Sequence, residues 1–288
     1  MFEGLSVALV TPFKDGVVDL KGFSRIIERL LNGGVDGLVV AGCTGEAATL
    51  SLDERDALIR AALELAKGKA FVVAGTGSND TKAAIAFTQR AEKLGVAGAM
   101  LITPYYNKPG PEGLFRHYSA VAQSTGLPII LYNVPSRTGV SLSPDTVKRL
   151  SAIPNVVAVK EAAGSLDQVS QILSLCDITV VSGDDSLTLP MLSVGARGVV
   201  SVAGHVVPRE IKSMLEAYSA GDVRRAAEIH LRLWPIFKAL FIETNPTPVK
   251  KALEILGLCR AEVRLPLSEA SETTAQSLRS ALAQVGAV

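Results

Sequence analysis

The chain has 288 residues, of which 48% are hydrophobic and 20% are charged, and its formal net charge at neutral pH is +1. This near-neutral balance argues against nucleic acid or an anionic membrane surface as a partner. The cysteines, Cys43, Cys176 and Cys259, are dispersed and never in CxxC spacing, so they predict neither a disulfide framework nor a zinc site. The sequence contains neither a signal-peptide pattern nor an apolar stretch of about 18 residues, and we expect a cytoplasmic protein.

Short apolar runs alternate with amphipathic segments over the first three quarters of the chain. Most of these runs are apolar on both faces, as in parallel strands that helices cover. The predicted strands are Leu5–Thr11, Gly37–Gly42, Phe71–Gly77, Gly98–Pro104, Pro128–Asn133, Val156–Ala162, Ile178–Gly183 and Gly198–Gly204. Consecutive β-α units with one handedness of crossover predict a (β/α)8 TIM barrel, with a doubly wound open sheet as the structural alternative.

Helix signals separate these runs. Ser51 begins a capping-box pattern, Asp80 has the sequence context of an N-cap, and Ser143 before a proline predicts another helix start. Only helices are expected near the C-terminus, over Val223–Leu240, Thr247–Leu256 and Ser268–Val285. We therefore expect residues 1–221 to form a catalytic barrel and residues 222–288 to form a C-terminal helical domain that packs on it.

Lys160 ends the apolar run VVAVKEA and is the residue that the sequence singles out for chemistry. Strand alternation predicts that Val156, Ala158 and Lys160 share one face. Burial of this end would lower the pKa of the amine, and a neutral amine can attack a carbonyl carbon to form a Schiff base. The structural alternative, a lysine that reaches the sheet rim or pairs with an acid, is more common for such a stretch taken alone.

Other reactive side chains follow the predicted strands, where TIM barrels have their active sites. The turn from Cys43 to Glu46 offers backbone N–H groups to an anion, although a plain tight turn fits the same letters. Tyr132 can exchange a proton beside Lys160 or make only a structural hydrogen bond. Arg137 has the planar fork that binds a carboxylate, or it is an ordinary surface arginine.

The sequence predicts no metal site and no cofactor. Its three histidines are scattered, and neither a dinucleotide fingerprint nor a phosphate-binding loop is present. The acidic pair Asp184 and Asp185 can bind a metal, but we expect it to cap the next helix instead.

Six motifs occur in a fixed order: GCTGEAATL, PYYNKP, YNVPSRTG, VKEA, SGDD and NPTPVK. Together they resemble the dihydrodipicolinate synthase branch of the N-acetylneuraminate lyase family of class I aldolases, over essentially the whole chain. The resemblance implies a lyase that condenses pyruvate with L-aspartate 4-semialdehyde through an imine and an enamine. The implied product is 4-hydroxy-tetrahydrodipicolinate, formed in the first committed step of diaminopimelate and L-lysine biosynthesis.

The resemblance also implies the catalytic residues, and it reverses the structural alternatives given above. Lys160 matches the Schiff-base lysine and Tyr132 the acid/base tyrosine. Thr44 and Tyr106 match its proton-relay partners, and Tyr106 crosses the dimer interface from a neighbouring subunit. A homotetramer, organised as a dimer of dimers, is therefore implied.

Substrate contacts follow in the same way. The N–H groups of Cys43 and Thr44 match the pyruvate carboxylate site, and Arg137 matches the residue that holds the semialdehyde carboxylate. Gly183 and Val200 match backbone contacts around the pocket. Relatives usually carry two adjacent hydroxyl residues in the turn, so any side-chain role of Cys43, a weaker hydrogen-bond donor, is in question.

Besides Cys43, a second difference from the family pattern concerns feedback inhibition by L-lysine. Inhibited relatives bind it at the dimer interface, at positions that match Leu52, Arg55, Asn79, Ala83 and Tyr105. Because residue 83 is not an acid and residue 55 is a cation, the lysine ammonium group loses a partner and gains a repulsion. We therefore expect inhibition by L-lysine to be weak or absent.

Three alternatives remain from the sequence. A pyruvate-dependent aldolase of the same family can act on a sugar-derived aldehyde, although sugar-specific relatives tend to lack the arginine of SRTG. A non-catalytic barrel that binds a keto acid is the rival outside enzymes. A metal-dependent aldolase is disfavoured because the histidines form no cluster.

Overall fold

The computed structural model describes the whole chain, Met1–Val288, and contains a closed barrel of parallel strands. The barrel strands are β1 (Gly4–Ala8), β4 (Gly37–Val40), β5 (Phe71–Gly75), β6 (Gly98–Ile102), β7 (Ile129–Asn133), β8 (Val156–Glu161), β9 (Thr179–Ser182) and β10 (Gly198–Ser201). Strand β1 pairs with both β4 and β10, which closes the sheet. The predicted TIM barrel is thus confirmed, and the open sheet is excluded.

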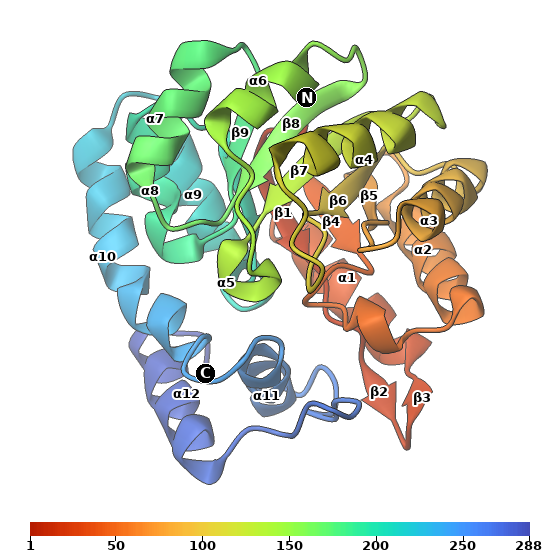
Figure 1. The fold of residues 1–288 in the computed structure, drawn as a ribbon. Coiled ribbons are helices and arrows are strands. Elements are labelled where there is room, and N and C mark those ends of the chain that lie inside the picture. Colours follow the sequence, from red (N-terminus) through yellow and green to blue (C-terminus); the bar gives the residue numbers. More distant parts are fainter.

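Helices cover the outside of the barrel (Figure 1). They are α1 (Leu20–Asn32), α2 (Leu52–Ala66), α3 (Thr81–Leu94), α4 (Pro111–Gln123), α6 (Pro144–Ser151), α7 (Leu166–Leu175), α8 (Thr188–Ser193) and α9 (Pro208–Ser219). The short helix α5 (Pro135–Thr138) lies instead at the carboxyl end of the barrel strands (Figure 1). Short 3-10 helices, η1 (Ala47–Thr49), η2 (Asp185–Leu187) and η3 (Ala203–His205), follow β4, β9 and β10. The predicted helix starts are confirmed, because Ser51, Asp80 and Ser143 each cap the following helix.

Several predicted strands run past the observed ones at their carboxyl ends. The apolar run of β1 continues through Leu9 and Val10, which are buried beyond the last paired residue. A hairpin of two short strands, β2 (Phe13–Lys14) and β3 (Val17–Val18), was not predicted. Its strands are too short to show a period-two pattern.

Strand β8 contains an irregularity that corrects one expectation. Its pairing with β7 skips Val157, which makes this residue a β-bulge. Val156 consequently packs with Val159 in the layer between strands and helices, whereas Ala158 packs inside the barrel. Of the predicted apolar row, only Ala158 lies on the inner face that leads to Lys160.

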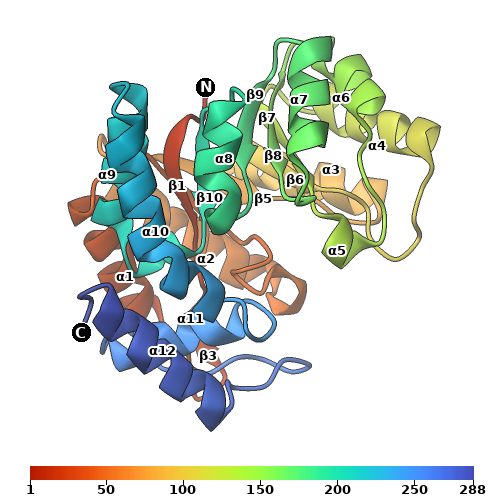
Figure 2. The ribbon, with the colours of Figure 1, turned by 90° about the vertical axis from the view of Figure 1, so that its left-hand side faces the viewer.

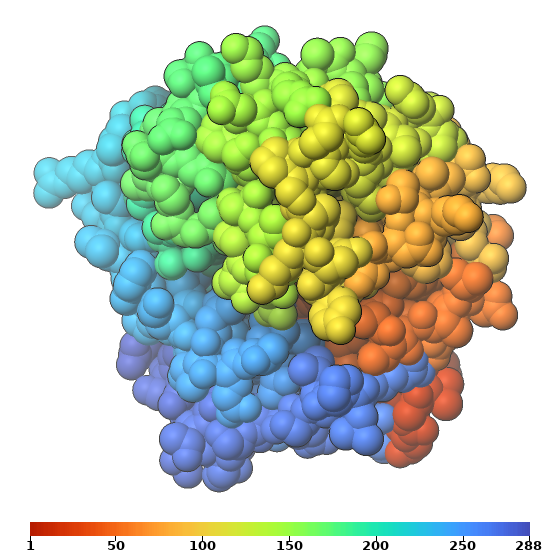
Figure 3. All heavy atoms as spheres, viewed as in Figure 1, coloured from red at the N-terminus to blue at the C-terminus, as the bar shows by residue number.

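The C-terminal part is helical, with α10 (Val223–Ala239), α11 (Thr247–Ile255) and α12 (Glu272–Gln284). Helix α12 begins later than the predicted Ser268, because Ser271 is its N-cap. Figures 1 and 2 show α11 and α12 side by side, and Figure 3 shows the blue C-terminal residues packed against the rest of the chain. A single apolar cluster includes Leu38 of the barrel and Leu253 of α11. The division of the chain after residue 221 stays a prediction.

No helix combines the length and the apolar character that crossing a bilayer requires.

Candidate active site

Lys160 projects from β8 into a cavity of about 260 Å³ at the carboxyl end of the barrel strands. The residue is only 5% exposed, and Nζ lies 4.2 Å from the centre of the Tyr132 ring on the neighbouring strand β7. Burial lowers the pKa of Lys160 to about 8, although Cys43 and Asp185 attract its charged form. A sizeable fraction of the amine is therefore neutral near pH 7, as attack on a carbonyl carbon requires.

Gly183, directly after β9, leaves the space that the Lys160 side chain occupies. A Cβ atom at this position would lie 2.9 Å from Cε of Lys160 and 2.7 Å from Cβ of Ala162. Both separations are well below the roughly 3.5 to 4.0 Å of carbon–carbon contact. The absence of a side chain at Gly183 is therefore needed for the observed position of the lysine, in addition to the backbone contact that the family resemblance implies.

Within the turn after β4, the residue that interacts with Tyr132 is Cys43. Burial raises the pKa of the Tyr132 phenol far above its ordinary value, and the interaction with Cys43 raises it further, whereas the Arg137 charge lowers it. Thr44, which we expected to be the relay partner, instead has its hydroxyl oxygen 2.9 Å from the Asn245 side-chain nitrogen, which donates to it. Cys43 packs against the apolar cluster that contains Tyr132, whereas the Thr44 hydroxyl is bonded to Asn245, so residue 43 rather than residue 44 faces the tyrosine.

The backbone of the same turn offers two donors. The N–H groups of Gly45 and Glu46 donate to carbonyl oxygens within the turn, whereas those of Cys43 and Thr44 donate to no protein acceptor. Cys43 and Thr44 both line the cavity that contains Lys160. These N–H groups are thus available to a ligand oxygen, as the sequence predicts for a carboxylate.

Arg137 enters the cavity from α5, the short helix after β7. No carboxylate pairs with its guanidinium group, which donates to the backbone oxygen of Asn245 at 3.2 Å. Asn245 was missed as a site residue, although it lies in the NPTPVK motif. Its side-chain nitrogen holds Thr44, and its side-chain oxygen is buried without a partner. The C-terminal part also contributes Phe237, Lys238 and Phe241 to the cavity wall.

Two predicted residues lie outside this cavity in the single chain. Tyr106 is 88% exposed and has a positive φ of 72° in the loop after β6. Val200 packs inside the barrel, and Val202, two residues further, lines the cavity instead. The predicted roles of both residues stay predictions.

The family model described as the Dihydrodipicolinate synthetase family matches residues 1–285. The chain belongs to this family. A 4-hydroxy-tetrahydrodipicolinate synthase of Citrifermentans bemidjiense is 50% identical over 280 residues, which cover 96% of this chain and 97% of that protein. The protein of the same name from Geotalea uraniireducens is 49% identical over the full length of both chains. The crystal structure of dihydrodipicolinate synthase from Thermotoga maritima superposes with a TM-score of 0.99, at 43% identity and with full coverage of both chains.

The positions that match the L-lysine site of the family are only partly brought together. Arg55 and Tyr105 line a second cavity, of about 350 Å³, next to the first, whereas Leu52, Asn79 and Ala83 do not line it. The Arg55 guanidinium donates to the backbone oxygen of Ala47 and lies over the ring of Phe87. An arginine held in this way keeps a positive charge in the wall of the second cavity.

The acidic pair has structural partners. Asp184 caps η2 by accepting from the N–H of Ser186, which confirms its predicted role. Asp185 accepts from the hydroxyl of Ser201 and from the N–H groups of Val202 and Ala203, so it fixes the turn after β10. No group of three or more His, Cys, Asp or Glu side chains is arranged to hold a metal ion.

Proposed function

We propose that this chain condenses pyruvate with L-aspartate 4-semialdehyde to give 4-hydroxy-tetrahydrodipicolinate. The observation that carries the proposal is the buried Lys160, whose pKa is lowered to about 8 and whose Nζ faces a cavity with unused backbone donors. The relatives named above add the identity of the substrates. The unpaired guanidinium of Arg137 supports a second substrate with its own carboxylate.

The proposed reaction begins when neutral Nζ of Lys160 attacks the keto carbon of pyruvate and water leaves, which forms an imine. Loss of a proton from the pyruvate methyl group gives an enamine, because the iminium nitrogen accepts the electron pair. The enamine carbon attacks the aldehyde carbon of the semialdehyde. The amino group of that substrate then displaces Lys160, which closes the ring and frees the enzyme.

In this scheme the proton transfers pass through Tyr132. Because its pKa is raised, the phenol is protonated near neutral pH and can donate to the alkoxide oxygen that forms in each addition. We assign the neighbouring relay position to the Cys43 thiol rather than to the Thr44 hydroxyl. The exposed Tyr106 is proposed to complete the relay of a second subunit, within a cytoplasmic homotetramer.

Trapping of the imine tests the proposal. The protein is incubated with pyruvate and borohydride, with and without the semialdehyde, and the adduct is located by intact mass and peptide mapping. We expect a pyruvyl adduct on Lys160 that decreases when the semialdehyde is added and product forms. A Lys160→Ala variant is the control and should carry no adduct.

The remaining outcomes distinguish the alternatives. An adduct that the semialdehyde leaves unchanged points to another aldehyde, such as one derived from a sugar. Absence of any adduct in the parent protein overturns the imine mechanism and favours a barrel that only binds a keto acid.

A further inference from the structure

The turn that carries Cys43 and Thr44 is held by charged groups from the C-terminal part of the chain. Nζ of Lys250, in α11, lies 2.5 Å from Oε1 of Glu46, although 204 residues separate the two in sequence. Both side chains are withdrawn from solvent, Lys250 completely and Glu46 to within 1%. Oε2 of Glu46 accepts from the backbone N–H of Arg264 at 2.9 Å. Each oxygen of the buried carboxylate therefore has a partner beyond residue 222.

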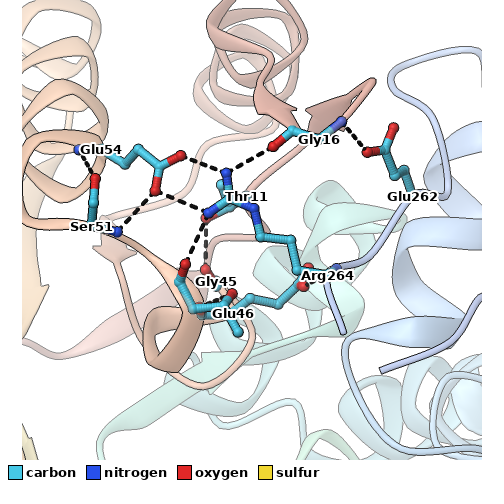
Figure 4. A network of polar contacts seen from close by, with 9 residues as sticks. Thr11, Gly16, Gly45, Glu46, Ser51, Glu54, Glu262 and Arg264 are labelled. Carbon is cyan, nitrogen blue, oxygen red and sulfur yellow. Dashed lines mark hydrogen bonds and ion pairs between the residues drawn. The ribbon is translucent and has the colours of Figure 1, made fainter. Parts of the chain in front are cut away.

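The backbone of this turn needs such support. Glu46 has φ 54° and ψ 38°, and Ala41, just before the turn, also has a φ of 54°. Left-handed conformations are unfavourable for residues with a Cβ atom, so neighbouring contacts must maintain them. The hydroxyl of Thr11 donates to the backbone oxygen of Gly45 at 2.7 Å and holds the turn from the barrel side (Figure 4).

A second contact layer surrounds the pair. The guanidinium of Arg264 donates to both carboxylate oxygens of Glu54 and to the backbone oxygen of Thr49, so it fixes η1 and the first turn of α2 (Figure 4). The ring of Phe13 lies 4.3 Å from Nζ of Lys250 and 4.3 Å from the guanidinium carbon of Arg264. The turn is thus enclosed by contacts that its own strand and helix cannot supply.

We propose that Glu46 and Lys250 are positioning residues for the 2-oxo acid substrate. Their ion pair fixes the N–H groups of Cys43 and Thr44 relative to Lys160, so that the substrate carboxylate is held while its keto carbon reaches Nζ. Neither residue lines the cavity that contains Lys160, and Glu46, which borders the second cavity, has a side chain that is only 1% exposed, so both act through the turn. This inference rests on the proposed function, because it assumes that a carboxylate binds at these N–H groups.

Pairing also balances charge close to the site. An unpaired Glu46 carboxylate would repel the substrate carboxylate, and an unpaired Lys250 ammonium group would attract it away from the turn. In the Glu46–Lys250 ion pair the two charges cancel, so the pair holds the turn without repelling or attracting the substrate carboxylate. Removal of one partner should therefore weaken the binding of pyruvate more than it slows the chemistry of bound pyruvate.

The test compares the parent protein with Lys250→Met, Glu46→Gln and the double variant. Lys251→Met is the matched control, because Lys251 lies in the same helix and pairs with Glu254 at 2.6 Å, away from the turn. The pyruvate concentration at half-saturation is measured by imine trapping and, independently, by isothermal calorimetry. Circular dichroism verifies that each variant is folded.

We expect Lys250→Met to raise the half-saturating pyruvate concentration about tenfold or more, with the trapping rate at saturation changed less than about threefold. Lys251→Met should match the parent. If Lys250→Met fails to fold, the double variant decides, because it leaves no unpaired buried charge and should still raise the half-saturating pyruvate concentration through the lost positioning of the turn.

A folded Lys250→Met or double variant with the half-saturation of the parent overturns the proposal. Failure of the proposed function is separate, since it appears as absence of a trapped adduct in the parent. In that case only the calorimetric titration, which measures pyruvate binding without imine trapping, tests whether Glu46 and Lys250 position the substrate. A parent protein that binds no pyruvate overturns both proposals.

Discussion

Replacement of Gly183 by alanine tests whether the space beside Lys160 is essential. The added Cβ atom would lie 2.7 Å from Cβ of Ala162, and 2.9 and 3.2 Å from Cε and Cγ of Lys160. Carbon atoms in contact are about 3.5 to 4.0 Å apart, so the end of the lysine must move by roughly 1 Å. Gly183 has no positive φ, and the substitution therefore adds a steric contact without backbone strain.

The size of the effect follows from this displacement. Misplacement of a reacting group by about 1 Å can cost roughly 100-fold in rate, which is about 2.7 kcal/mol of activation free energy. Overpacking of a buried site lowers the free energy of unfolding by about 1 to 3 kcal/mol. We expect Gly183→Ala to remain folded and to form the pyruvate imine about 100-fold more slowly than the parent.

The assay measures the rate of adduct formation on Lys160 at saturating pyruvate, with thermal unfolding recorded in parallel. Gly110→Ala is the control, because Gly110 has a φ of −72° and a Cβ atom there would meet nothing within 4 Å. A folded Gly183→Ala protein whose imine rate stays within about threefold of the parent would refute the steric argument, since the expected loss is about 100-fold.

Four further predictions concern the imine rate and the stability as functions of pH, the Cys43 thiol, and feedback by L-lysine. The imine rate should rise about tenfold per pH unit and level off above the Lys160 pKa of about 8; a midpoint near that of a free lysine would contradict this. Between pH 8 and 10.5 the unfolded chain binds more protons at Lys160 than the folded chain does. The free energy of unfolding should therefore rise by roughly 3 kcal/mol over this range, relative to the Lys160→Met variant. Chemical denaturation at a series of pH values measures this change. Cys43→Thr should keep or improve turnover, because a hydroxyl is the stronger donor; a loss beyond about tenfold in a steady-state assay argues against it. L-lysine should inhibit weakly or not at all, because Arg55 repels its ammonium group and Ala83 offers no acid, and a titration that reveals sub-millimolar inhibition would disprove this.

Most of the barrel could be predicted from the sequence, because its strands are buried on both faces and its helices carry local start signals. The capping box at Ser51 and the N-caps at Asp80 and Ser143 depend only on residues within one turn. The β-bulge at Val157 could not be predicted in this way. A bulge depends on how two strands pair, and the letters of one strand do not contain that information.

The candidate site was predicted where strand ends alone determine it. Lys160 and Tyr132 lie opposite each other on β8 and β7, as their places at the ends of two adjacent apolar runs suggest. The side-chain neighbours of Cys43 and Thr44 were harder to predict, because side-chain directions in a turn depend on backbone angles and not on a periodic pattern. The steric role of Gly183 became visible only when the lysine side chain was in place.

The contrast between two buried lysines explains why the role of a buried charged residue could not be predicted from its local sequence. Lys160 and Lys250 are both withdrawn from solvent, and burial lowers the pKa of each. Lys250 has the Glu46 carboxylate at 2.5 Å, which favours its charged form and makes it a structural cation. Lys160 forms no such pair, so its amine can lose the proton and act as a nucleophile. The chemical fate of a buried lysine therefore depends on a partner that lies about 200 residues away in sequence for one and is absent for the other.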